Sequence, residues 1–110
     1  MSGAPNNRRA QRKSIARDGV VVCGPGLTHF DCTIANISTT GAGIRLAIGA
    51  VVPDNLHLIS MADRRAYAAM VMWRKPGAMG LKFVSVIDLG KLPSKELEFL
   101  NRIWIERSSR

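Results

Sequence analysis

The chain of 110 residues is long enough for one domain with a hydrophobic core and too short for two domains of ordinary size. Hydrophobic residues make up 46% of it and charged residues 22%, proportions typical of a globular fold. No apolar run approaches the roughly 18 residues that a transmembrane helix needs, so we expect a soluble protein without membrane insertion. The formal net charge of +8 favours anionic partners, carried by a nucleotide, a nucleic acid or a membrane.

Most of the excess positive charge lies at the N-terminus. Residues 1–17 contain five basic residues and no acidic one, which accounts for +5 of the net +8. Residues 1–14 are otherwise small and polar, so we expect a flexible basic arm in the free protein. The five basic residues are Arg8, Arg9, Arg12, Lys13 and Arg17.

Cysteine usage indicates a reducing compartment. Cys23 and Cys32 are the only cysteines, and no apolar segment typical of a signal peptide precedes them. We therefore expect a cytoplasmic protein with two free thiols. A zinc site that combines them with His29 and His57 is a weak alternative, because structural zinc sites usually pair their cysteines closely, and we predict no metal.

The segment 15–90 has the pattern of short β-strands separated by turns. Val20–Cys23 is a β-branched run that ends before a Pro-Gly turn, and Phe30–Ile37 alternates between apolar and polar residues. Strands with this spacing indicate a small barrel or sandwich rather than alternating strands and helices. Further strands are predicted at 43–48, 56–60, 67–74 and 79–84.

Residues 91–110 are predicted to form a terminal helix that packs on the strands. Ser94 follows a proline and is a favourable N-cap. Leu97, Leu100 and Trp104 share one helical face, which we expect to be buried.

Two short motifs stand out. Arg8–Arg12 reads R-x-x-x-R within the arm, and Asn36–Gly41 reads N-x-S-x-x-G at a turn between strands. In this order and spacing, over residues 8–86, they resemble the PilZ family of bacterial receptor domains for the second messenger cyclic di-GMP. The resemblance implies a six-stranded antiparallel β-barrel with a flexible arm and a C-terminal helix. It also implies that Arg8, Arg12, Asn36, Ser38 and Gly41 bind the nucleotide, with Arg9 as a helper.

The chemistry of these residue types suits a guanine nucleotide. The planar arginine fork matches guanine O6 and N7 and can also bind a phosphate, so Arg8 and Arg12 could hold both groups. We expect the side-chain oxygen of Asn36 to accept from the guanine N1 and N2 hydrogens, and Ser38 to bond a phosphate or a base edge. Gly41 is expected to let the backbone turn sharply beneath the ligand. The commoner family residue at position 36 is Asp, which carries a charge that Asn lacks.

Other functions remain open at this point. No arrangement of nucleophile, base or paired carboxylates supports an enzyme. A small basic barrel could instead bind RNA or single-stranded DNA, but the aromatic residues needed as stacking platforms are few, at 5%. A third reading is a PilZ-like scaffold that no longer binds nucleotide. For the first reading we expect an unidentified effector protein as partner and no cofactor besides the ligand.

Several large side chains have plain structural interpretations. Trp73 is expected to pack at the barrel rim, and Trp104 between the helix and the barrel. The methionines are expected to fill the core. They are Met61, Met70, Met72 and Met79.

Overall fold

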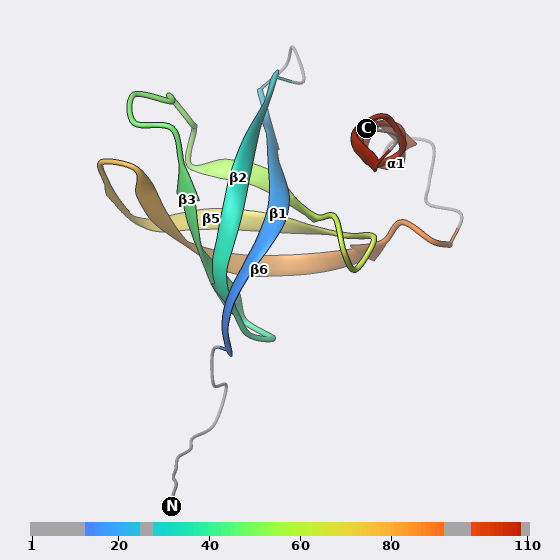
Figure 1. Ribbon diagram of the computed structural model, residues 1–110, viewed down its shortest axis with the longest axis horizontal. Helices are drawn as coiled ribbons and strands as arrows, with labels where there is room; N and C mark the ends of the chain where they lie inside the picture. The colour runs from blue at the N-terminus through green and yellow to red at the C-terminus, as the bar shows by residue number, and fades with distance from the viewer. Residues whose placement is uncertain (1–12, 25–27, 92–97, 109–110) are drawn as a thin grey trace, which may run out of the picture.

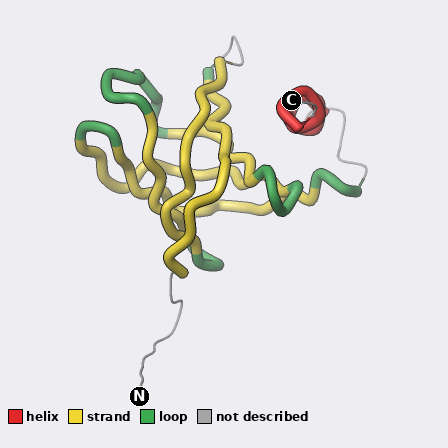
Figure 2. Tube along the Cα trace, viewed as in Figure 1, coloured by secondary structure: helices red, strands yellow, loops and turns green. Residues whose placement is uncertain are grey.

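The structure, a computed structural model, describes residues 13–24, 28–91 and 98–108, with the side chains of the first strand described from residue 16 onward. Six antiparallel strands close into a barrel in the order β1-β2-β3-β6-β5-β4, and one helix lies beside it (Figures 1 and 2). This confirms the mostly-β fold with a terminal helix. The elements are β1 (Lys13–Cys23), β2 (Thr28–Ile37), β3 (Gly41–Leu46), β4 (Asn55–Ser60), β5 (Arg65–Lys75), β6 (Ala78–Asp88) and α1 (Glu98–Ser108).

The barrel interior is filled by aliphatic side chains from alternate strand positions. The largest of them are at most 1% exposed and come from five strands. This alternation is what a sheet with one face toward the core requires. The stacked rings of Tyr67 and Phe83, 4.1 Å apart, complete the interior. The fully buried interior residues are Val21, Ile34, Ile44, Leu58 and Leu81.

A second, smaller core lies between the outside of the barrel and α1. Val20 and Val22 point outward from β1 and are each 1% exposed, because Leu100 and Ile103 of α1 cover them. Both faces of β1 are therefore buried at this point. The uninterrupted β-branched run at 20–22, which does not alternate with polar residues, follows from this double burial.

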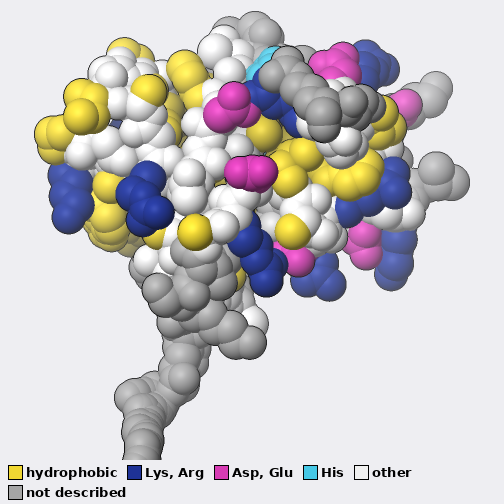
Figure 3. Space-filling model, in the orientation of Figure 1, with side chains coloured by type: hydrophobic (Ala, Val, Ile, Leu, Met, Phe, Trp, Pro, Cys, Tyr) yellow, Lys and Arg dark blue, Asp and Glu magenta, His cyan; other side chains and the backbone are white. Residues whose placement is uncertain are grey.

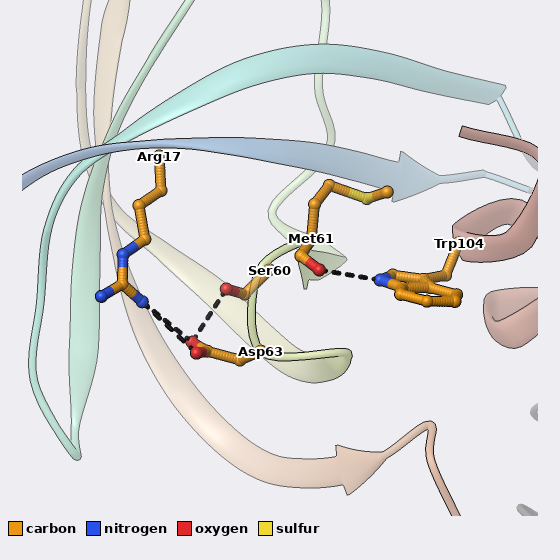
Figure 4. Close-up of polar contacts among 5 residues, drawn as sticks. All are labelled: Arg17, Ser60, Met61, Asp63 and Trp104. Carbon is orange, nitrogen blue, oxygen red and sulfur yellow. Dashed lines mark hydrogen bonds and ion pairs between the residues drawn. The ribbon is translucent and has the colours of Figure 1, made fainter. Parts of the chain in front are cut away.

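Polar contacts at the β4–β5 turn hold both the helix and β1 in place. The indole of Trp104 donates to the Met61 carbonyl at 2.9 Å (Figure 4). The Arg17 guanidinium lies 3.3 Å from the Asp63 carboxylate, which also accepts from the Ser60 hydroxyl at 3.0 Å. Trp104 therefore packs between helix and barrel, as predicted.

Two further arginines hold α1 against the barrel. The Arg64 guanidinium stacks over the Trp104 ring at 4.4 Å, and it extends from a residue with a positive φ of 53°. Near the end of the helix, Arg107 forms an ion pair with Asp31 of β2. A cation in the last turn also suits the helix dipole.

Some predictions about individual residues differ from the structure. Met79 is buried, but Met70 is 44% and Met72 61% exposed, so the prediction that these two fill the core was wrong. Tyr67, Ala69 and Val71 of β5 face the interior, so alternation along the strand turns Met70 and Met72 to the outer face of the barrel. The third strand begins at Gly41 and ends at Leu46, so Ile48 lies outside it and is exposed.

The first strand begins earlier in the chain than the sequence indicated. β1 begins at Lys13, two residues before the expected start of the barrel at residue 15. The described part of the helix begins at Glu98. The predicted N-cap Ser94 and the predicted face residue Leu97 lie outside the described residues.

Candidate functional site

The N-x-S-x-x-G segment forms the tight turn between β2 and β3. The Ser38 N–H donates to the Gly41 carbonyl at 2.8 Å, and the Thr40 N–H donates to the Ser38 hydroxyl oxygen at 3.2 Å. The Ser38 hydroxyl also lies 3.2 Å from the Thr40 hydroxyl. The Thr40 carbonyl accepts from Phe83 N–H of β6 at 2.8 Å, which fixes the turn to the barrel. The motif is thus a rigid platform and not a loose loop.

Gly41 is needed for a reason other than the expected one. Its φ is not positive, unlike those of Gly24, Gly49 and Gly77. A Cβ atom at position 41 would instead collide with the backbone carbonyl oxygen of Leu81. Glycine therefore allows β3 and β6 to approach closely at the start of β3. The sharp turn is present, but it does not require the backbone conformation that only glycine adopts readily.

Asn36 occupies an irregular position in the sheet. It lies opposite Ser14 of β1 and Gly43 of β3, and the register shifts next to it in both pairings. Such bulges redirect a side chain relative to the regular pleat. The Asn36 side-chain oxygen accepts from the Gly43 N–H at 3.0 Å. A Cβ atom at position 43 would lie 2.8 Å from the Asn36 amide nitrogen, so the amide rests directly on this glycine.

A second glycine continues this surface onto β6. Gly43 pairs with Gly80 across the β3–β6 ladder, and the indole of Trp73 lies directly against Gly80. Ala42 and Ile44 point into the core, so Gly43 faces outward. We call Gly43 and Gly80 the glycine floor. Both glycines are buried, because the Asn36 amide covers Gly43 and the Trp73 indole, 44% exposed, covers Gly80.

The surroundings of the turn are basic. Lys82 is exposed on β6 and pairs with Gly41. β1 begins at Lys13, which pairs with Ile37 next to the turn. Figure 1 shows the start of β1 and the β2–β3 turn at the same end of the barrel. The structure therefore brings Asn36, Ser38 and Gly41 together. The predicted arm residues Arg8, Arg9 and Arg12 lie outside the described residues.

A cleft of about 1070 Å³ lies away from the β2–β3 turn, between the end of α1 and strands β1–β3. It includes none of the three motif residues. Arg17 and Arg107 line it, but each is already paired with an aspartate. Burial, with a smaller contribution from Asp18, raises the pKa of the Cys32 thiol in its wall to about 12. Such a thiol is protonated and unreactive at neutral pH.

Comparison with known protein families decides the relationship. The model of the PilZ domain matches residues 6–97, which is most of the chain and includes both motifs. The chain belongs to the PilZ family. A search of curated proteins found no match.

Two residues of this PilZ domain's candidate site were missed in the sequence. Gly43 and Gly80 are not part of either motif, and their pairing depends on β3 lying beside β6. The G-A-G sequence at 41–43 was a signal that the backbone is approached closely at two successive outward positions. Trp73 was predicted to pack at the barrel rim, and its contact with Gly80 agrees with that.

Proposed function

We propose that this protein is a receptor for cyclic di-GMP, and not an enzyme, and that the nucleotide binds on the outer face of the barrel at the β2–β3 turn. Members of the PilZ family are generally cyclic di-GMP receptors. The observation that carries the proposal is the intact N-x-S-x-x-G turn beside the point where the arginine-rich arm joins β1.

The connection between the arm and the turn supports joint binding. Arg12 directly precedes Lys13, which pairs with Ile37 next to the turn, so the arm joins the barrel beside the turn. Arg8 is five residues from Lys13, and a chain of that length spans at most roughly 17 Å. Both guanidinium groups can therefore reach a ligand on the turn without any movement of the barrel.

Side chains at and near the β2–β3 turn carry groups that can bind a guanine base and a phosphate. The Asn36 side-chain oxygen accepts from the Gly43 N–H at 3.0 Å, and an amide oxygen is the type of acceptor that a guanine N–H requires. The Asn36 amide and the Trp73 indole cover the two glycines of the floor, so a planar base on this face would meet these two side chains. The Ser38 hydroxyl in the turn and the exposed ammonium of Lys82, which pairs with Gly41, are groups of the kind that bind a phosphate.

Regulation would follow from the new surface that the ligand creates. We propose that a doubly anionic nucleotide bridges the arm arginines and the turn, and that an effector protein recognises the combined surface. The positive charges of residues 8–17 oppose such a docked state until the anion neutralises them. The partner protein is thus expected to bind only the ligand-loaded form.

The aromatic residues in the described part of the chain give little support to the alternative of RNA binding. Tyr67 and Phe83 stack on each other in the barrel, and Trp104 is held against Met61. Among the Phe, Tyr and Trp side chains of residues 16–24, 28–91 and 98–108, that of Trp73 has the largest exposed fraction, and a single platform suits one base rather than a strand of stacked bases.

Alanine substitutions in the arm test the proposal. Arg8→Ala and Arg12→Ala should each weaken cyclic di-GMP binding about ten- to a hundredfold, because each removes a charge-assisted hydrogen bond worth roughly 1.5–3 kcal/mol. Arg102→Ala, which removes an exposed arginine of α1, is the matched control for net charge. The affinities are measured by isothermal titration. Arm variants that bind like the Arg102→Ala control would exclude the arm from the site.

A further inference from the structure

Two loops at one end of the barrel expose large aliphatic side chains. Ile48 is 79% and Val51 85% exposed, the highest values among the large hydrophobic residues of the described segments. Both belong to the β3–β4 loop, which lies beside the β5–β6 hairpin at the left of Figure 1. The Leu46 N–H donates to the Gly77 carbonyl of that hairpin at 3.0 Å, and a Cβ at position 77 would lie 3.3 Å from the Ile48 side chain. We call residues 46–52 and 73–78 together the loop tip.

The exposed side chains are held outward by the structure beneath them. Val52 is buried, at 4% exposure, and its carbonyl accepts from the Arg74 guanidinium at 2.6 Å. The same guanidinium contacts the Asp54 carboxylate at 2.8 Å. Because Val52 is anchored in this way, its neighbour Val51 is directed away from the barrel. The apolar surface is therefore preorganised, so its exposure is not the result of a loose loop.

Positive charge surrounds the loop tip. Arg45, which pairs with Ala78 and also lines the 1070 Å³ cleft, and Lys75 are exposed next to it, and the third cation, Arg74, is paired with Asp54. Within residues 45–54 and 72–78 the only acid is Asp54. These two segments contain three cations and one acid, so their net charge is +2. Figure 3 shows hydrophobic side chains at the left end of the molecule with Lys or Arg side chains next to them. This combination is complementary to a surface that is apolar within and anionic at its edge.

We propose that the loop tip docks on the surface of a bilayer containing anionic lipids, with Ile48 and Val51 entering the headgroup region and Arg45 and Lys75 contacting lipid phosphates. Ile48 and Val51 project from a turn, and neither lines the 1070 Å³ cleft beside α1 or a smaller cleft of about 400 Å³ near Phe99. A protein segment would need such a groove, or a flat face, to bind. The contact is shallow and peripheral. No helix in the described parts of the chain is long and apolar enough to span a membrane.

Co-sedimentation with vesicles tests the docking. Since the arm is itself basic, all variants carry Arg8→Ala, Arg9→Ala and Arg12→Ala in the full chain. The test variant replaces Ile48 and Val51 with Ser. The matched control replaces Val84 and Val86, which are 66% and 60% exposed on β6, with Ser. Each is mixed with vesicles of phosphatidylcholine alone and of phosphatidylcholine with phosphatidylglycerol, and circular dichroism checks that the fold is kept.

The arm-substituted protein should bind the mixed vesicles and not those of phosphatidylcholine alone. The Ile48 and Val51 double variant should bind the mixed vesicles on the order of tenfold more weakly, because two aliphatic side chains no longer leave water. The control double variant should bind unchanged. Absence of binding by the arm-substituted protein, or equal loss in both double variants, would overturn the proposal. So would a dimer in sedimentation velocity that only the Ile48 and Val51 variant loses, since the surface would then serve a second copy of the chain.

Discussion

Replacement of Gly43 by Ala should separate binding from stability. The new Cβ would lie 2.8 Å from the Asn36 amide nitrogen and 3.1 Å from its oxygen, so the amide must move away from the floor. The 3.0 Å bond from the Gly43 N–H to Asn36 would then lengthen or break. The loss of such a bond costs about 0.5–1.5 kcal/mol, and alanine regains about 0.5–1 kcal/mol over glycine in a strand. The free energy of unfolding should therefore change by less than about 1 kcal/mol.

Binding should respond much more strongly to the same change. If the Asn36 oxygen accepts from guanine, its displacement should weaken cyclic di-GMP binding about tenfold or more. Isothermal titration measures the affinity, and urea unfolding measures the stability.

Gly41→Ala provides the contrast. Its Cβ would meet the Leu81 carbonyl of the backbone, which cannot rotate away, so β3 and β6 must separate. This variant should lose roughly 1–3 kcal/mol of stability. A Gly43→Ala protein that binds cyclic di-GMP with the parent's affinity would refute the role given to Asn36.

Two further predictions concern Asn36 and Cys32. Asn36→Asp should raise the affinity for cyclic di-GMP modestly in isothermal titration, because one carboxylate oxygen can keep the Gly43 N–H while the other attracts the guanine donors; a large loss would place a phosphate there instead. Burial raises the pKa of the Cys32 thiol from 9.0 to about 12. Between these two pH values the thiol of the unfolded chain has lost a proton that the thiol of the folded chain retains. The free energy of unfolding should therefore fall as pH rises, by about 2–3 kcal/mol near pH 11. Cys32→Ala should flatten this part of the stability curve in urea unfolding, and an unchanged slope would show that other groups cause it.

Much of the fold was predictable because the signals are local. Alternation placed Cys32 and Ile34 on the inner face of β2, and the Pro-Gly turn placed the β5–β6 hairpin. The uninterrupted run at 20–22 predicted a strand, but the sequence could not say that α1 covers its second face, because that depends on a contact about 80 residues away. Met70 and Met72 were misplaced because β5 is apolar on both faces, so hydrophobicity alone does not show which alternate positions face the interior.

The candidate site divides in the same way. The turn that contains Asn36, Ser38 and Gly41 is contiguous in sequence, so its motif identified it directly. The glycine floor joins β3 to β6 and is bounded by residues from β2 and β5, four strands that a linear motif does not connect. The requirement for glycine at position 41 likewise comes from the neighbouring β6 backbone and not from the turn itself.

Isothermal titration of the unmodified full chain tests the central claim most directly. Cyclic di-GMP, GTP and a short single-stranded RNA are titrated separately at one fixed salt concentration, since nucleic-acid affinities depend on salt. The account predicts saturable binding of cyclic di-GMP that is tighter than the binding of GTP or RNA. No saturable heat with cyclic di-GMP, or an RNA affinity equal to or greater than that for the nucleotide, would contradict it.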